Sequence, residues 1–146
     1  MSHADLVARA VKWLKGTRRC ILVVSDFKWW GGECPDAMGW TYGGLSTLIE
    51  CKASRADFQA DKRKPWRRHS SMGLGIARYY LTPRGLLTVD EIPKEWGLLE
   101  VRGSVIRVVT AAPTRAYELG PRNEIRMVVN VARRIKEGWG DTEDVE

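Results

Sequence analysis

The stretch from Pro35 to Lys52, PDAMGWTYGGLSTLIECK, decides how the rest of this chain is interpreted. Two apolar runs flank the tight-turn sequence YGG, so the pattern predicts two strands, over 35–40 and 45–52. Because side chains alternate across a strand, Glu50 and Lys52 are expected to share one face, and Cys51 to point away toward a packed helix. Asp36, at the start of the earlier strand, is expected to converge with Glu50 and Lys52.

Further elements are expected on both sides of these strands. Ser2 followed by Asp5 is a helix-capping pattern, and apolar residues then recur at helical spacing until Gly16, which predicts an amphipathic helix. The other expected elements are a strand over 20–27, a helix over 54–64, a basic surface loop over 66–75, a strand over 77–82, and a hairpin over 97–101 and 105–110. A last helix is expected to be capped by Asn123 and to end at Gly138. Its inward face is expected to carry Ile125, Val128, Val129, Ala132 and Ile135. This order predicts an α/β fold.

Length and composition limit the class of protein. The chain has 146 residues, of which 44% are hydrophobic and 29% charged, which predicts one globular domain over residues 1–137 rather than a disordered chain. No apolar run approaches the ~20 residues that span a bilayer, and there is no sign of a secretory signal, so we expect a cytoplasmic protein without a membrane partner. Cys20, Cys34 and Cys51 lack C-x-x-C spacing, which predicts free thiols rather than disulfides or a zinc site.

Charge is distributed unevenly along the chain. The net charge is +6, yet the last ten residues contain five acidic residues and no Lys or Arg, so residues 1–136 carry +11. Residues 52–68 alone carry a net charge of +5. Such a cluster suits a polyphosphate backbone, and a solvated basic helix end is the alternative. The segment 138–146 is expected to be a disordered acidic tail that aids solubility or competes with nucleic acid for the basic face.

Asp36, Glu50 and Lys52 are the residue types that phosphodiester hydrolysis requires. Two carboxylates, with waters and substrate phosphate oxygens, are a typical ligand set for Mg²⁺. Lys52 would orient or help to deprotonate the attacking water, or would stabilise negative charge in the transition state.

The same residues resemble a known motif. Pro35-Asp36, followed by Glu50-Cys51-Lys52 at the end of an apolar strand, resembles the signature of the PD-(D/E)XK nuclease superfamily. The sequence from about residue 2 to about residue 110 is similar to small prokaryotic and phage members, including MmcB-like DNA repair proteins. The resemblance implies a restriction-endonuclease-like core of helix, three-strand meander, helix and strand, here with an added C-terminal hairpin and helix.

The resemblance also implies roles for individual residues. Asp36 and Glu50 would bind Mg²⁺ (or Mn²⁺) together with the backbone carbonyl of Cys51, and Lys52 would be the catalytic lysine. Glu33 would add a third carboxylate or would cap its loop. Asp5, the acidic residue on the first helix, would reach the metal or would serve as a helix-capping residue.

Nucleic-acid contacts are expected from the basic segment. Arg55 and Gln59 lie one helical turn apart and could contact phosphates. Trp66 has the aromatic character that stacks on unpaired bases, and packing on the core is its alternative role. The expected nucleic-acid-binding residues are Arg55, Gln59, Lys62, Lys64, Trp66, Arg67 and Arg68. Asp57 and Asp61 are expected to form ion pairs on the helix surface.

The sequence therefore predicts a metal-dependent DNA endonuclease of DNA repair, recombination or phage DNA processing. Without a visible recognition domain, we expect it to be directed by DNA structure rather than by base sequence. One alternative is a non-cleaving nucleic-acid-binding module with a nuclease fold, acting in a larger complex. Another is a protein that regulates a nucleoprotein by imitation, suggested only by the acidic tail. A homodimer and a further protein partner are left open.

Overall fold

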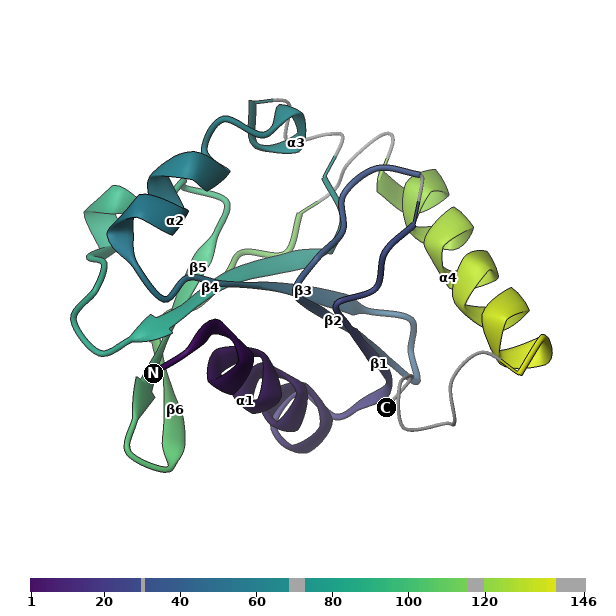
Figure 1. The fold of residues 1–146 in the computed structure, drawn as a ribbon, viewed down its shortest axis with the longest axis horizontal. Coiled ribbons are helices and arrows are strands. Elements are labelled where there is room, and N and C mark those ends of the chain that lie inside the picture. Colours follow the sequence, from purple (N-terminus) through teal and green to yellow (C-terminus); the bar gives the residue numbers. More distant parts are fainter. Residues whose placement is uncertain (30, 69–72, 116–119, 139–146) are drawn as a thin grey trace.

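The computed structural model describes residues 1–29, 31–68, 73–115 and 120–138. In chain order its elements are α1 (His3–Gly16), β1 (Cys20–Ser25), β2 (Ala37–Thr41), β3 (Ser46–Cys51), α2 (Arg55–Asp61), α3 (Pro65–Arg68), β4 (Ala77–Pro83), the 3-10 helix η2 (Val89–Glu91), β5 (Gly97–Arg102), β6 (Val105–Thr110) and α4 (Gly120–Lys136). The strands form one sheet in the order β1-β2-β3-β4-β5-β6, with helices on both faces (Figure 1). The predicted α/β class is confirmed.

The sheet is mixed. Strand pairs β1–β2, β2–β3 and β5–β6 are antiparallel, whereas β3–β4 and β4–β5 are parallel. Parallel neighbours need a crossover connection, and α2 and α3 provide one between β3 and β4. The predicted hairpin of β5 and β6 forms, and β5 extends the sheet beside β4.

Helix α1 packs on one face of the sheet. It begins with the predicted capping box, because the Ser2 hydroxyl accepts from the Asp5 N–H and the Asp5 carboxylate accepts from the Ser2 N–H. Leu6 and Leu14 are fully buried in a cluster that includes Cys51 of β3. Each of these leucines contributes about 1.5–3 kcal/mol to folding. The prediction that Cys51 points toward a packed helix is confirmed.

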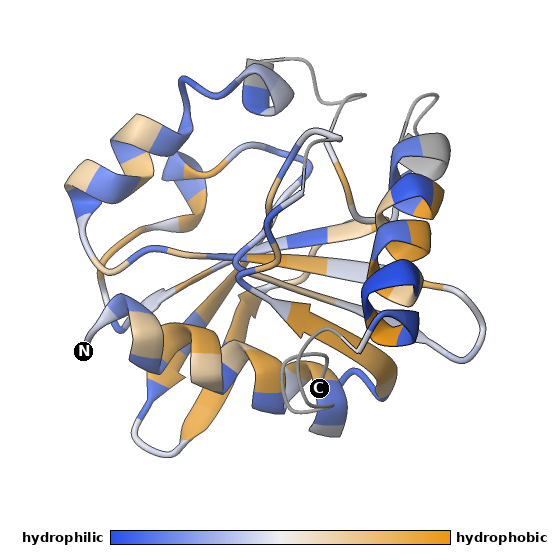
Figure 2. Ribbon diagram, turned by 45° about the vertical axis from the view of Figure 1, so that its right-hand side comes forward, coloured by the Kyte–Doolittle hydropathy of each residue, from blue (hydrophilic) through white to orange (hydrophobic). Residues whose placement is uncertain are grey.

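The opposite face of the sheet is covered by α2 and α4. Phe58 of α2 and Met127 of α4 belong to one buried cluster with Trp40 of β2, Leu48 of β3 and Tyr80 of β4. The strands between these two helices are rich in hydrophobic residues (Figure 2). Alternation along β3 therefore places Leu48 and Glu50 on the face of α2, and Cys51 on the face of α1.

Two predictions between β3 and β4 are corrected. Helix α2 ends at Asp61 instead of residue 64, and residues 65–68 form α3 instead of a surface loop. Pro65 is the first residue of α3, a position that its fixed φ suits and where its missing N–H costs no hydrogen bond. Residues 69–72 of the predicted loop lie outside the described residues.

The predicted orientation of α4 is also wrong. The helix begins at Gly120, so Asn123 lies in its first turn and is not the cap. Its buried residues include Met127 and Val131, which pack in the core. Of the five residues predicted to face inward, only Val128 packs against the core; Ile125, Val129, Ala132 and Ile135 are exposed.

A polar contact explains this rotation of α4. The Trp40 indole Nε1 donates to Glu124 Oε1 at 2.9 Å, and both side chains are buried. A buried glutamate with a partner on a distant strand has no signature in the sequence. Hydrophobic periodicity alone therefore predicts that the more apolar side of α4 is buried. The structure instead buries the side of α4 that carries Glu124.

The predictions on the cysteines, on membrane spans and on the acidic tail can also be compared with the structure. The three cysteines are free, with Cys20 and Cys51 buried. No helix among the described residues is long and apolar enough to span a bilayer. The predicted acidic tail lies outside the described residues apart from Gly138.

The orientation of α4 can be tested with two alanine variants. We expect Met127→Ala to lower the free energy of unfolding by about 2–5 kcal/mol, because it leaves a cavity at a fully buried position. Ile125→Ala should change it by less than about 0.5 kcal/mol, because Ile125 is mostly exposed. Urea unfolding measures both values, and the reverse ranking would contradict this orientation.

Candidate active site

The candidate site lies where β2 begins and β3 ends. Ala37 pairs with Ile49 in the antiparallel ladder, and continuing this register by one residue sets Asp36 opposite Glu50. Asp36 Oδ2 also accepts a hydrogen bond of 2.8 Å from the backbone N–H of Cys51. The sheet thus brings the two predicted carboxylates together, as the sequence predicted.

Glu50 and Lys52 share one face of β3, as expected. Lys52 Nζ lies 3.4 Å from Glu50 Oε2, and the Glu50 side chain is only 2% exposed. The backbone N–H of Lys52 donates to the carbonyl of Leu81 on β4 at 3.0 Å, which fixes the chain just past the end of β3. Asp36 is partly exposed, so solvent reaches this end of the site.

Asp61, at the end of α2, is the centre of the charge network. Its side chain is fully buried, with Oδ1 3.2 Å from Lys52 Nζ and 3.0 Å from Lys64 Nζ. Its Oδ2 accepts from Arg67 Nε at 2.7 Å and from the Tyr80 hydroxyl at 2.6 Å. The prediction of a surface ion pair for Asp61 is therefore wrong, because the last turn of α2 faces the sheet.

Arg67 is likewise buried. Its side chain is 3% exposed, forms an ion pair with Glu33 and has Nη2 3.5 Å from Glu50 Oε1. Its guanidinium also lies over the ring of Trp96, 4.5 Å from the centroid. We correct the prediction that Arg67 contacts nucleic acid, because α3 turns its side chain into the protein, where it neutralises carboxylates.

The network shifts the pKa values of its carboxylates in opposite directions. Burial, and after it the charge of Asp36, raise the pKa of Glu50 to about 8, although Arg67 and Lys52 oppose this shift. Burial alone would raise the pKa of Asp61, but Arg67, the Tyr80 hydroxyl and Lys52 together hold it well below its usual range. Asp61 is therefore the permanent anion of the network, and Glu50 carries the variable charge.

His3 is a member of the site that the sequence analysis missed. Its Nε2 lies 3.2 Å from Asp36 Oδ1, and its side chain is half exposed at the start of α1. Only the packing of α1 across the sheet creates this contact, so no local pattern in the sequence could have revealed it.

Glu33 and Asp5, the two further metal ligands that the resemblance suggested, have other partners in the structure. Glu33 pairs with Arg67, and its Oε1 accepts from the backbone N–H of Leu74 at 2.9 Å. The Asp5 carboxylate accepts from the backbone and hydroxyl of Ser2 in the capping box. Among the described residues, no three His, Cys, Asp or Glu side chains are placed to hold a metal ion. The carboxylates of Glu33 and Asp5 are both engaged in contacts within the protein.

The remaining predicted nucleic-acid contacts vary in exposure. Gln59 and Lys62 are exposed, and Lys62 Nζ lies 4.8 Å from the centre of the Phe58 ring. Lys64 is partly exposed. Arg55 is exposed but pairs with Glu91 and donates to the carbonyl of Leu86 at 2.9 Å.

Trp66 and Arg68 belong to α3. Trp66 is half-buried, and its indole nitrogen is buried without a hydrogen-bond partner. The side chain of Arg68 lies outside the described part of the structure.

Comparisons with known proteins support the fold. No protein-family model and no curated protein matches the chain. Among solved structures, the chain is similar to SPO1766, a protein of unknown function from Silicibacter pomeroyi, at 25% sequence identity and a TM-score of 0.67. The match covers 93% of this chain and 90% of that one. It carries no information about activity.

The raised pKa of Glu50 predicts a pH-dependent stability. A carboxyl group with a raised pKa in the folded state stabilises the protein below its unfolded value of 4.5, and this contribution is lost as the pH rises to about 8. The difference in free energy of unfolding between wild type and Glu50→Gln should therefore shift in favour of the variant across this range. Each pKa unit between the folded and unfolded states corresponds to about 1.4 kcal/mol.

Urea unfolding at a series of pH values, in EDTA, measures this difference. Asp57→Asn removes an exposed carboxylate from the same region and is the matched control. A difference between wild type and Glu50→Gln that is independent of pH would show that Glu50 titrates normally.

Proposed function

We propose that this protein is a metal-dependent deoxyribonuclease of the PD-(D/E)XK type, with α1, β1–β3, α2 and β4 as its restriction-endonuclease-like core. The observation that carries the proposal is the convergence of Asp36 and Glu50 at the end of β3, with Lys52 Nζ 3.4 Å from Glu50. Two carboxylates beside a lysine suit phosphodiester hydrolysis, in which charge develops on phosphate oxygens.

The donor set fits Mg²⁺, which protein sites bind through one or two carboxylates and several waters. Asp36 and Glu50 would hold the ion together with the carbonyl of Cys51. Glu50 Oε1 is buried and accepts no hydrogen bond, although Arg67 Nη2 lies 3.5 Å away, so a bound cation would give this oxygen a direct partner. Bound there, Mg²⁺ would supply a polarised water and would neutralise charge on the phosphate.

The chain's own residues would position the reaction. Lys52 would hold the attacking water or stabilise the charge that develops on the phosphate oxygens. Asp61 lies 3.2 Å from Lys52 Nζ and holds the end of this side chain in place beside Glu50. The water oxygen would form a bond to phosphorus as the opposite ester bond breaks, and the leaving oxygen would take up a proton.

The cations around Glu50 differ in their freedom to move. Arg67 is enclosed and bound to Glu33 and Asp61, so it would remain in place. Lys64 is 39% exposed and lies 4.0 Å from Glu50 Oε2. When a divalent cation neutralises Glu50, Lys64 would keep its ion pair with Asp61, 3.0 Å away, and turn from Glu50 toward a DNA phosphate.

The proposed substrate is DNA, recognised by its structure. Gln59, Lys62 and Lys64 are accessible polar residues of α2 and of the turn that follows it. Contacts of this kind bind the phosphate backbone and do not read bases. A role in DNA repair, recombination or phage DNA processing fits such an enzyme.

Cleavage of labelled DNA tests this function. We expect wild type to cut at least one of linear duplex, single strand, flap and four-way junction DNA with Mg²⁺ or Mn²⁺, and not in EDTA. Asp36→Ala and Lys52→Ala should lower the cleavage rate at least about a hundredfold, in line with the loss of a group that acts in the transition state. Lys94→Ala removes an exposed lysine outside the site and should retain full activity.

Circular dichroism would show whether each variant folds. A folded Asp36→Ala protein with full activity would overturn the proposal. Binding of DNA without cleavage under every metal would favour the alternative, a non-cleaving module with this fold.

A further inference from the structure

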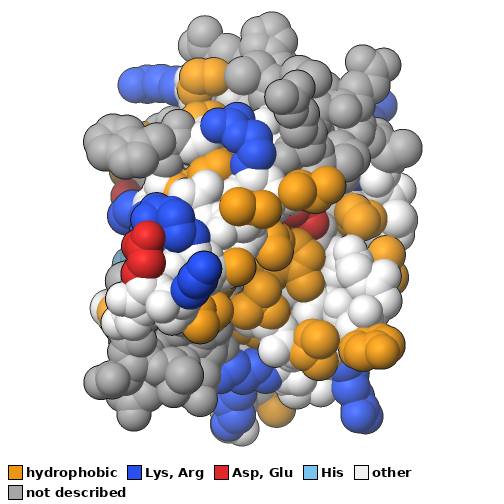
Figure 3. All heavy atoms as spheres, turned by 90° about the vertical axis from the view of Figure 1, so that its right-hand side faces the viewer, with side chains coloured by type: hydrophobic (Ala, Val, Ile, Leu, Met, Phe, Trp, Pro, Cys, Tyr) orange, Lys and Arg blue, Asp and Glu red, His pale blue; other side chains and the backbone are white. Residues whose placement is uncertain are grey.

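Helix α4 presents an apolar stripe to solvent. Ile125 and Val129 are 63% and 60% exposed, Ile135 is 47% exposed, and Ala132 between them is also exposed. They stand at positions i, i+4, i+7 and i+10, so they share one face of the helix over about 15 Å. Hydrophobic side chains gather in the middle of the side of the molecule that carries α4 (Figure 3).

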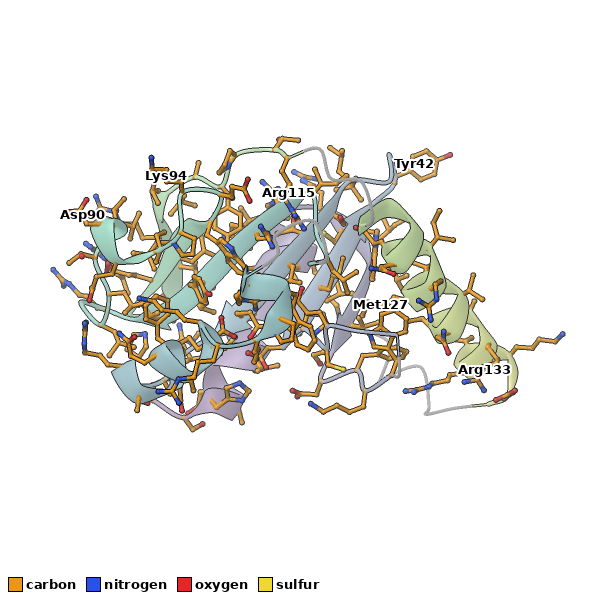
Figure 4. The ribbon with its side chains drawn as sticks, turned by 90° about the horizontal axis from the view of Figure 1, so that it is seen from above. Tyr42, Asp90, Lys94, Arg115, Met127 and Arg133 are labelled. Atoms are coloured by element: carbon orange, nitrogen blue, oxygen red, sulfur yellow. The ribbon has the colours of Figure 1, made fainter. Side chains whose placement is uncertain are left out.

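The protein's own contacts fix the direction in which the stripe faces. Glu124 accepts from the Trp40 indole at 2.9 Å, and Met127 lies between α4 and the sheet (Figure 4). Near the other end, Arg134 donates to the carbonyl of Lys28, and its guanidinium lies 4.3 Å from the centre of the Phe27 ring. The helix cannot rotate to bury the stripe without breaking these contacts.

One flank of the stripe is basic. Arg126 and Arg133 each follow a stripe residue by one position, which sets them about 100° further around the helix. Lys136 adds a third exposed cation, and among residues 120–138, the part of this region that the structure describes, Glu137 is the one exposed carboxylate. Arg133 pairs with Glu137 at 2.9 Å, but both side chains are more than half exposed, so this pair is weak and exchangeable.

We propose that α4 is a docking helix for an amphipathic helical segment of another protein, with acidic residues beside its apolar stripe. The partner's apolar residues would cover Ile125, Val129 and Ile135, and its carboxylates would pair with Arg126 and Arg133. Helices of this kind bind apolar faces through residues at the same i, i+3, i+4 and i+7 spacing.

Charge argues against a second copy of this chain as the occupant. In an antiparallel pair of identical helices, the two-fold axis sets the same flank of each helix side by side. Arg126 and Arg133 of one copy would then lie beside those of the other. A parallel pair would align the two helix dipoles, which is also unfavourable.

Two designed peptides of three heptads test the proposal by fluorescence anisotropy with the full chain. Both carry Leu at the a and d positions; one has Glu and the other Lys at the flanking e and g positions. We expect only the Glu-flanked peptide to bind, and its affinity to fall as salt is added. This readout does not depend on nuclease activity, so it can fail or succeed independently of the proposed function.

Two valine variants with the same exposure locate the binding face. Val129→Asp should weaken binding of the Glu-flanked peptide at least about tenfold, because it sets a carboxylate in the centre of the stripe. Val105→Asp makes the same change at a 61% exposed position on β6 and should leave the affinity unchanged. Circular dichroism confirms that both variants fold.

Three results would overturn the proposal. Equal binding of both peptides would mean that the stripe has no charge preference, and no binding of either would mean that α4 is not a docking face. A wild-type dimer in sedimentation that Val129→Asp dissociates would make a second copy the occupant.

Discussion

The carboxylate of Asp61 is fully buried, and Lys52, Lys64, Arg67 and the Tyr80 hydroxyl surround it. A buried anion costs several kcal/mol to desolvate, and only a complete set of partners offsets this cost. The partners come from the end of β3, from the turn after α2, from α3 and from β4. The polar face of the candidate site therefore depends on one charge that cannot be satisfied unless all four segments are in place.

This arrangement separates two carboxylates that lie close together. Asp61 stays ionised because cations and a hydroxyl group surround it, whereas burial and Asp36 raise the pKa of Glu50 to about 8. Glu50 has cations beside it, but burial makes its ionised form costly, and a bound divalent cation would offset that cost. Asp61 thus stabilises the fold, whereas Glu50 would serve the proposed chemistry.

Local patterns in the sequence correctly predicted those features that are set by residues close together along the chain. The alternation of Glu50, Cys51 and Lys52 and the capping box of Ser2 and Asp5 are correct because both follow from backbone geometry. The pairing of Asp61 with Lys52, the burial of Arg67 and the contact of His3 with Asp36 could not be predicted. Each joins residues from different elements, and nothing in a single sequence distinguishes a buried charge from an exposed one.

The most direct test of the account is a crystal structure of the protein soaked with Mn²⁺, with anomalous scattering used to locate the ion. We predict a peak about 2.0–2.2 Å from carboxylate oxygens of both Asp36 and Glu50, with the Cys51 carbonyl as a further ligand and Lys64 turned away from Glu50. Crystals that show no ion there at a concentration that supports DNA cleavage, or an ion bound elsewhere, would contradict the account.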